Sequence, residues 1–157
     1  GYQLDNAGML YDFGLMKGTV KEFIDSMDHC YILCSKDDEE FRNFIKKSCH
    51  RWIEVPFNPS AECLSVYIHK YINNILEHTR CMNGEGNIKC ISVRYHETTT
   101  GWAESCLDDV TVFWDDDWCS QITYSDGVVS DWSDDLITIM NGGMIDNPIV
   151  EQQINLK

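Results

Sequence analysis

The stretch VRYHETTTGWAE, residues 93 to 104, places polar chemistry where a β-strand should present a core face. Val93, Tyr95 and Glu97 alternate, so a carboxylate takes the next place in a row of hydrophobic side chains. Three threonines follow, beginning with Thr98. An ionised carboxylate accepts two parallel hydrogen bonds, which makes Glu97 a candidate ligand-binding residue. The alternative is a solvated residue at the end of a strand.

Two further sets of polar side chains stand at expected helix ends. Asp28 and His29 follow one apolar helical stripe, and Ser60 and Glu62 stand at the start of another. The helix dipole favours a carboxylate near a helix N-terminus and a histidine near a C-terminus, which explains both sets structurally. Catalysis is the other explanation for His29, because imidazole titrates near neutral pH and suits proton transfer.

Eight cysteines raise the question of disulfides or a metal site. We expect no signal peptide, and therefore reduced, mostly buried thiols in a cytoplasmic protein. The one loose cluster of candidate zinc ligands comprises Cys30, Cys34, Cys49 and His50. Strong zinc sites usually pair their ligands more closely than this, so core cysteines are the favoured interpretation.

The spacing of apolar residues predicts the elements that carry these side chains. A strand end at 8–13 precedes a helix over 14–28, and Asn58-Pro59 begins a second helix over 59–78. Two strands are expected at 88–96 and 99–106. Weaker signals predict a short helix at 36–47 and an extended segment at 51–57. This order indicates an α+β fold in which two helices cover one face of an antiparallel sheet.

The net charge of -14 belongs mainly to residues 95–157. Residues 1–94 hold 13 acidic and 11 basic side chains, whereas residues 95–157 hold 13 acidic side chains and one base, Lys157. Nucleic acid and anionic membranes are disfavoured as partners, because phosphate binding needs clustered lysine and arginine. No apolar run reaches the roughly 20 residues that span a bilayer.

The acidic part of the chain is predicted to be a β-rich extension. Its strand candidates are the short apolar runs at 111–114, 121–124, 128–132 and 136–140. Asp126-Gly127 and Asn141-Gly142 are typical of hairpin turns. We therefore divide the chain into a domain at 1–106 and an acidic β extension at 107–157.

Four motifs in series resemble the 6-pyruvoyl-tetrahydropterin synthase family. They are GMLYDF at 8–13, Asp28-His29, NPSAE at 58–62 and VRYHETTTGWAE. The branch most similar to them is 6-carboxy-tetrahydropterin synthase, an enzyme of queuosine biosynthesis whose strand pair reads like V-x-V-x-E-T-P-T-S-x-A. The resemblance covers about residues 5–106.

The resemblance implies the tunnelling fold, an antiparallel sheet with two helices on one face that assembles into barrels. It implies that a pterin, in the form of dihydroneopterin triphosphate, binds at a subunit interface where Glu97 anchors its pyrimidine edge. Asp28 and His29 match residues of a proton relay that includes a cysteine base. The residues implied for substrate binding are Glu97, Glu62, Ser60 and Thr98.

Zinc is also implied by the resemblance, but its ligands are absent from this chain. In the family three histidines hold the metal, and the catalytic cysteine lies between them. All of these precede the segment matched by GMLYDF, and none of the five histidines present substitutes for them. The chain begins with Gly1 rather than Met, so we expect further sequence before it.

Two functions stay open. In the first, this is part of a tetrahydropterin-forming enzyme whose preceding segment supplies zinc ligands and cysteine. In the second, the fold persists without the chemistry, and the acidic extension has a structural or binding role in a larger assembly. A homo-oligomer, trimer-based or hexameric, is expected in either case, because exposed sheet edges are normally paired.

Overall fold

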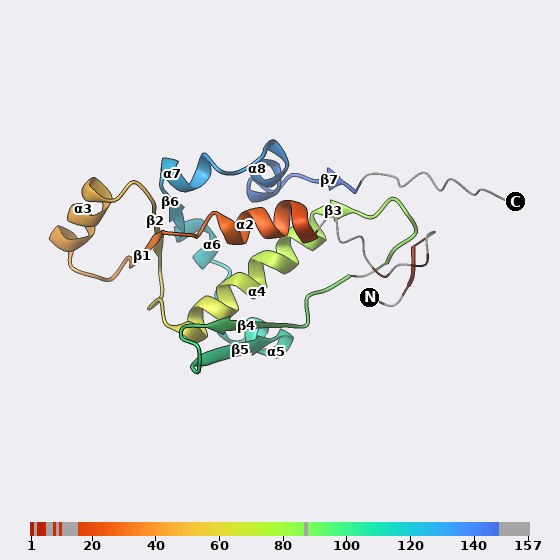
Figure 1. Ribbon diagram of the computed structural model, residues 1–157, viewed down its shortest axis with the longest axis horizontal. Coiled ribbons are helices and arrows are strands. Elements are labelled where there is room, and N and C mark those ends of the chain that lie inside the picture. Colours follow the sequence, from red (N-terminus) through yellow and green to blue (C-terminus); the bar gives the residue numbers. More distant parts are fainter. Residues whose placement is uncertain (2, 6–7, 9, 11–15, 87, 148–157) are drawn as a thin grey trace, which may run out of the picture.

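The computed structural model describes residues 1, 3–5, 8, 10, 16–86 and 88–147. Short helices and strands surround one long helix, α4, in a mixed α/β arrangement (Figure 1). The elements are η1 (Met16–Val20), α2 (Lys21–Asp25), β1 (Tyr31–Cys34), α3 (Glu39–Ser48), β2 (Trp52–Val55), α4 (Ala61–Glu77), β3 (Thr79–Arg80), β4 (Ser92–His96), β5 (Trp102–Cys106), α5 (Leu107–Phe113), α6 (Trp118–Gln121), β6 (Thr123–Tyr124), α7 (Asp126–Val129), α8 (Asp134–Met140) and β7 (Ile145–Asp146).

The central helix α4 forms where the apolar stripe predicts it, but it begins at Ala61, so the start predicted from Asn58-Pro59 is two residues too early. Ser60 stands at the N-cap, and its hydroxyl accepts a hydrogen bond from the backbone N–H of Cys63 at 3.4 Å. The apolar stripe is buried, and its members are Leu64, Tyr67, Ile68, Tyr71, Ile72 and Ile75. The prediction of a helix over 59–78 is therefore confirmed, with bounds at 61 and 77.

The first helix packs against α4 through aromatic rings. Phe23 stacks on Tyr71 with ring centroids 5.2 Å apart and also contacts Tyr67. The described part begins at 16 and passes through η1 into α2, with non-helical backbone angles at Gly18. The side-by-side helix pair is confirmed, whereas most of the strand predicted at 8–13, and residues 14 and 15 of the helix, lie outside the described residues.

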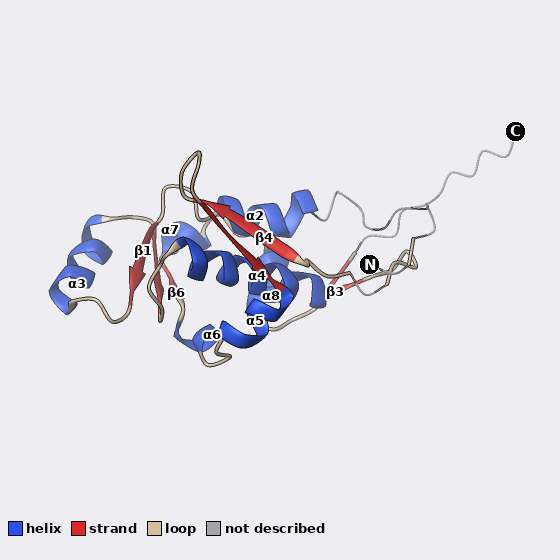
Figure 2. Ribbon diagram, turned by 90° about the horizontal axis from the view of Figure 1, so that it is seen from below, coloured by secondary structure: helices blue, strands red, loops and turns tan. Residues whose placement is uncertain are grey.

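The predicted strand pair is present as the antiparallel hairpin β4–β5, which lies against α4 (Figure 2). It begins later than predicted, at residue 92 rather than 88. The side chains of α4 account for the difference, because they occupy the backbone groups of Cys90. Its N–H donates to Asn73 Oδ1 at 2.9 Å, and its carbonyl oxygen lies 2.8 Å from His69 Nε2.

A single antiparallel sheet is not what the described residues form. Their strands make three small sheets, with the orders β1-β2-β6, β3-β7 and β4-β5. The helix predicted at 36–47 exists as α3, and it connects β1 to β2 as a crossover, so that these strands pair in parallel. The sequence pattern predicted α3 and β2, but it did not predict that β2 pairs with β1.

The prediction of a β-rich extension is wrong for the described residues 107–147, which we call the C-terminal segment. Four helices, α5 to α8, account for most of it, and its strands β6 and β7 are two residues each. Local capping favours helices over strands in this segment. At the start of α8 the Ser133 hydroxyl accepts a hydrogen bond from the backbone N–H of Leu136 at 3.3 Å. Asp126-Gly127 lies within α7, and Gly142 ends α8 with φ +78°.

The C-terminal segment shares its core with the preceding residues. Five of its side chains are buried in the same apolar cluster as α4, namely Trp114, Ile122, Val128, Leu136 and Ile139. The ring planes of Trp114 and Tyr67 stack with centroids 6.4 Å apart, and the hydroxyl oxygens of Tyr67 and Tyr124 lie 3.0 Å apart. The C-terminal segment therefore packs into the same core as α4.

Candidate functional site

Three sequence motifs lie toward one end of the layer formed by α2, α4 and the β4–β5 hairpin. The turn after α2, the start of α4 and the loop after β4 all occur at this end in both views (Figures 1 and 2). Asp28-His29 follow α2, Ser60-Glu62 stand at the start of α4 and Glu97-Thr98 follow β4, so each motif belongs to one of these three segments. Within the described residues no hydrogen bond or ion pair joins one of these motifs to another.

The loop that carries Glu97 closes on itself. The backbone N–H groups of Glu97 and Thr98 both donate to the carbonyl oxygen of Gly101, at 3.1 and 3.2 Å. The Thr98 hydroxyl oxygen accepts from the N–H groups of Gly101 and Thr100, at 2.8 and 3.4 Å. The Glu97 side chain is exposed and makes no hydrogen bond or ion pair in the described part of the chain, so its carboxylate is available to a ligand.

The start of α4 presents a second carboxylate. Glu62 is exposed in the first helical turn, and a hydrogen bond from its own backbone N–H, with a further one from the Ser60 hydroxyl, lowers the pKa of its carboxyl. Glu62 is also one of the lining residues of a groove of about 410 Å³ between α4, β5 and the C-terminal segment. Their position at the start of α4 therefore explains Ser60 and Glu62 structurally. A role of these residues in substrate binding stays a prediction.

Asp28 and His29 lie in the turn between α2 and β1. The His29 Nε2 and Asp28 Oδ2 atoms are 3.6 Å apart, and the two side chains are 90% and 77% exposed. His29 has φ 54°, in the left-handed region that residues with a Cβ atom adopt uncommonly. The sequence motif located this pair, but it gave no signal of the unusual backbone conformation.

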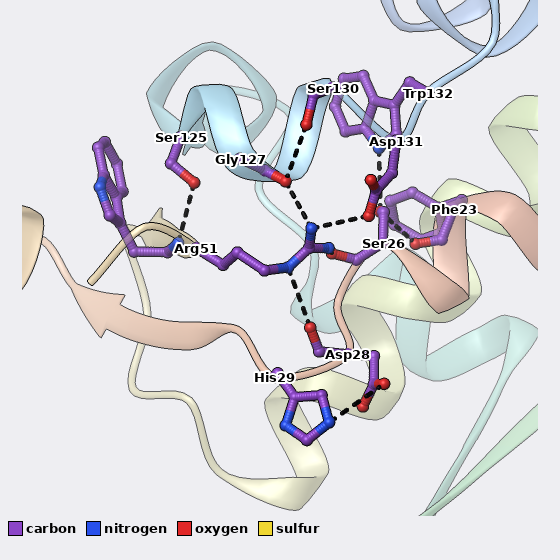
Figure 3. A network of polar contacts seen from close by, with 11 residues as sticks. Phe23, Ser26, Asp28, His29, Arg51, Ser125, Gly127, Ser130, Asp131 and Trp132 are labelled. Atoms are coloured by element: carbon purple, nitrogen blue, oxygen red, sulfur yellow. Dashed lines mark hydrogen bonds and ion pairs between the residues drawn. The ribbon is translucent and has the colours of Figure 1, made fainter.

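Arg51 contacts this turn and was missed by the sequence analysis (Figure 3). It precedes β2, and its guanidinium donates to the carbonyl oxygens of Ser26, Asp28 and Gly127 at 2.6, 3.2 and 2.5 Å. It also forms an ion pair with Asp131 at 2.7 Å. These partners are distant in the sequence, so no local pattern around Arg51 indicates its role.

The cysteine cluster does not form a metal site in the described residues, which contain no group of three or more His, Cys, Asp and Glu side chains placed to hold a metal ion. Cys30 precedes β1 and Cys34 ends it, so they do not share a helix face. Burial raises the pKa of the Cys30 thiol to about 11 despite the opposing charge of Arg51, which disfavours the thiolate that zinc prefers. Among the described residues, this cysteine cluster therefore does not fit the zinc that the family resemblance implies.

Other features agree with a structural interpretation. His69 is fully buried, and its ring nitrogens lie 3.1 Å from Ser105 Oγ and 2.8 Å from the Cys90 carbonyl oxygen. This histidine therefore has partners for both ring nitrogens within the core. All eight cysteines are unpaired, but only Cys34 is buried, so the prediction of mostly buried thiols is wrong. Among the helices in the described ranges, none has the length and apolar character needed to cross a membrane.

Comparison with known proteins relates most of the chain to one family. The family model described as 6-pyruvoyl tetrahydropterin synthase matches residues 1–106. Proteins named 6-carboxy-5,6,7,8-tetrahydropterin synthase from two strains of Helicobacter pylori are 44% and 43% identical to this chain over 108 residues, which is 69% of this chain and 54% of theirs. A protein with the same name from Aquifex aeolicus is 28% identical over 104 residues, covering 64% of this chain and 62% of its own. The chain thus spans about half the length of the Helicobacter relatives, and the family match ends where the C-terminal segment begins.

Proposed function

Because this chain belongs to the 6-pyruvoyl tetrahydropterin synthase family, we propose that it recognises a pterin as part of a lyase of the 6-carboxy-tetrahydropterin synthase type. The substrate of this proposal is dihydroneopterin triphosphate, and the product is a tetrahydropterin. The names of the relatives with 44% and 43% identity support the carboxy branch.

The observation that carries the proposal is the free carboxylate of Glu97. Backbone hydrogen bonds and those of the Thr98 hydroxyl close the loop around Glu97. The Glu97 carboxylate takes no part in these hydrogen bonds. A pterin offers neighbouring N–H donors on its pyrimidine edge, and one ionised carboxylate accepts two of them in parallel. A neutral or cationic side chain at this position would lack that pair of acceptors.

For the Asp28-His29 motif we propose a role in proton transfer. His29 follows α2 toward the same end as the loop that carries Glu97, and its Nε2 atom lies 3.6 Å from the carboxylate of Asp28. The described residues contain no group of His, Cys, Asp and Glu side chains placed to hold the zinc that the family resemblance implies. The proposal therefore assigns to this chain the recognition of the pterin and a proton-transferring histidine, without a step at the metal.

Assembly is part of the same proposal. The β4–β5 hairpin is a sheet of two strands, and each has one edge without a strand partner among the described residues. Unpaired strand edges are usually covered by another chain or element. We propose a homo-oligomer, trimer-based or hexameric, in which a tunnelling fold is completed between copies and the pterin meets Glu97 at a subunit interface.

Titration with neopterin tests the recognition step. Glu97→Gln keeps the shape of the side chain but turns an amide donor toward the N–H groups of the ligand. We expect Glu97→Gln to weaken the binding free energy of neopterin by about 1.5–3 kcal/mol, the range for hydrogen bonds to a charged group. Fluorescence titration should show this as a roughly tenfold to hundredfold lower affinity.

The matched control is Glu104→Gln on the neighbouring strand. Its carboxylate is paired with Arg94 at 2.9 Å, so it is not available to the ligand in the same way. Neopterin affinity should stay within about twofold in this variant, because no pterin contact is removed. Equal losses in both variants, or no measurable binding by the unchanged protein, would contradict the proposal.

A second function has one specific observation in its favour. The family match stops at residue 106, yet the C-terminal segment is built into the same core and carries many carboxylates. A module that retained the fold without the chemistry, and used its acidic surface as a structural or binding part of a larger assembly, would show this combination. Absence of neopterin binding would favour this function over the first.

A further inference from the structure

The turn that carries Asp28 and His29 needs support from outside itself. His29 has φ 54°, and the left-handed region places a Cβ atom close to the neighbouring carbonyl oxygen. Backbone hydrogen bonds hold the turn locally, from Met27 N–H to Ile24 O at 3.1 Å, from Asp28 N–H to Asp25 O at 2.9 Å and from Cys30 N–H to Met27 O at 3.2 Å. Unfavourable backbone conformations persist where surrounding contacts determine them.

Arg51 supplies such contacts. Its guanidinium donates to the carbonyl oxygen of Ser26, the C-cap of α2, at 2.6 Å and to that of Asp28, in the turn beyond it, at 3.2 Å. Carbonyl groups at a helix C-terminus lack partners within the helix and carry the negative end of its dipole, so a cation there is favourable on both counts. The planar fork of arginine allows one side chain to bind both carbonyls, which the ammonium of lysine does not reproduce.

The C-terminal segment holds Arg51 in this position from the other side. Gly127 O accepts from the guanidinium at 2.5 Å, and the Asp131 carboxylate lies 2.7 Å from it (Figure 3). Gly127 can approach because it lacks a side chain: a Cβ atom there would lie 2.5 Å from the backbone oxygen of His50. Trp132 Nε1 also donates to the Ser26 hydroxyl at 2.9 Å, which ties the same segment to the end of the first helix.

We propose that Arg51 is a positioning residue that fixes the Asp28-His29 turn, and that the C-terminal segment takes part in building the site by holding Arg51 through Gly127 and Asp131. The relevance of the turn to catalysis rests on the proposed function, whereas the structural statement does not. The chain therefore uses residues beyond the family match to define the backbone of a residue within it.

Hydrogen exchange measured by NMR on the full chain tests the inference. In Arg51→Gln the amides of Asp28 and Cys30 should exchange about tenfold faster or more, the change that follows from losing charge-assisted hydrogen bonds. Arg94→Gln is the matched control, because it removes an exposed guanidinium that pairs with Glu104 and lies over the Trp102 ring. Exchange at the turn should stay within about twofold in this control.

A graded series separates positioning from a general loss of stability. Asp131→Asn leaves the carbonyl contacts of Arg51 in place and should give a smaller increase than Arg51→Gln. The three-bond coupling between the amide and α protons of His29 reports its φ directly, and it should change in Arg51→Gln but not in Arg94→Gln. His29→Gly removes the penalty for a left-handed φ, so Arg51→Gln should cost less protection in that background, as a non-additive double-mutant cycle.

Unchanged exchange at both amides, with an unchanged His29 coupling, in a folded Arg51→Gln protein would overturn the inference. Should that variant not fold, Arg51→Lys and Asp131→Asn decide instead, and wild-type exchange in both would overturn it equally. Failure of the proposed function has a different signature, because it appears as the absence of neopterin binding by the unchanged protein. The two outcomes are measured independently.

Discussion

The loop that carries Glu97 and the turn that carries His29 lie toward the same end of the molecule but are held in opposite ways. Hydrogen bonds among residues 97–101 close the loop. Arg51, which itself binds Gly127 and Asp131, holds the turn. The loop is a self-contained unit, whereas the turn is assembled from three separate parts of the chain. A family match that covers both motifs therefore does not imply that both are completed by the matched residues.

The difference predicts that damage to the C-terminal segment reaches the turn before it reaches the loop. Leu136→Ala should have the largest effect, because this side chain is fully buried in the core shared with α4. Truncation of a buried leucine costs about 2–5 kcal/mol. Urea denaturation measures this loss, and hydrogen exchange should show the amides of residues 27–30 loosening more than that of Gly101.

Val112→Ala provides the comparison within the same segment. Its side chain is 73% exposed, so the free energy of unfolding should change by no more than about 0.5 kcal/mol. Equal destabilisation by the two substitutions, or equal loosening of turn and loop in Leu136→Ala, would remove the contrast between the two regions.

Low pH provides a second comparison, between the carboxyl of Glu54 on β2 and that of Glu104 on β5. Its oxygens lie 2.8 Å from Arg42 Nη1 and 2.8 Å from Lys46 Nζ. Burial raises the pKa of Glu54, but the hydrogen bonds and charges of Lys46 and Arg42 outweigh it, and the net pKa lies below its ordinary value of 4.5. A carboxyl whose folded pKa is depressed stabilises the protein above the unfolded pKa, and this stability is lost as the pH falls through the folded pKa.

We therefore expect the free energy of unfolding to decrease below pH 4.5, and Glu54→Gln to lose about 1.5–3 kcal/mol at neutral pH while flattening that decrease. Urea denaturation over a pH series measures both. The hairpin supplies the matched variant, because a hydrogen bond from Arg94 also lowers the pKa of Glu104. Glu104 is solvent-exposed, so Glu104→Gln should leave the acid slope nearly unchanged. An identical slope in Glu54→Gln and the unchanged protein would be the opposite result.

The smallest expected effect tests the loop itself. Thr98→Val removes the oxygen that accepts hydrogen bonds from the N–H groups of Gly101 and Thr100. Because the site is exposed and water replaces the lost bonds, the free energy of unfolding should fall by about 0.5 kcal/mol. The Gly101 amide should exchange several-fold faster while residues 27–30 are unaffected, and Thr98→Ser should behave as the unchanged protein. Loosening of the turn in Thr98→Val would show that the two regions are coupled after all.

The sequence by itself determined the features that depend on neighbouring residues. The apolar stripe specifies α4, alternation specifies the β4–β5 hairpin, and the four motifs indicate the family. Each of these signals acts within a few residues, since capping, periodicity and turn chemistry are local properties. Glu97 was identified for the same reason, because its place in the strand alternation and its loop are both local.

Only the tertiary structure decided the rest. The short apolar runs of the C-terminal segment are compatible with strands or helices, and helices prevail where they bury Leu136 and Ile139 against the core. The parallel pairing of β1 with β2 depends on the crossover through α3. Arg51 and Gly127 are 76 positions apart. A contact across that distance leaves no pattern in either neighbourhood, because its free energy depends on how the intervening chain is folded.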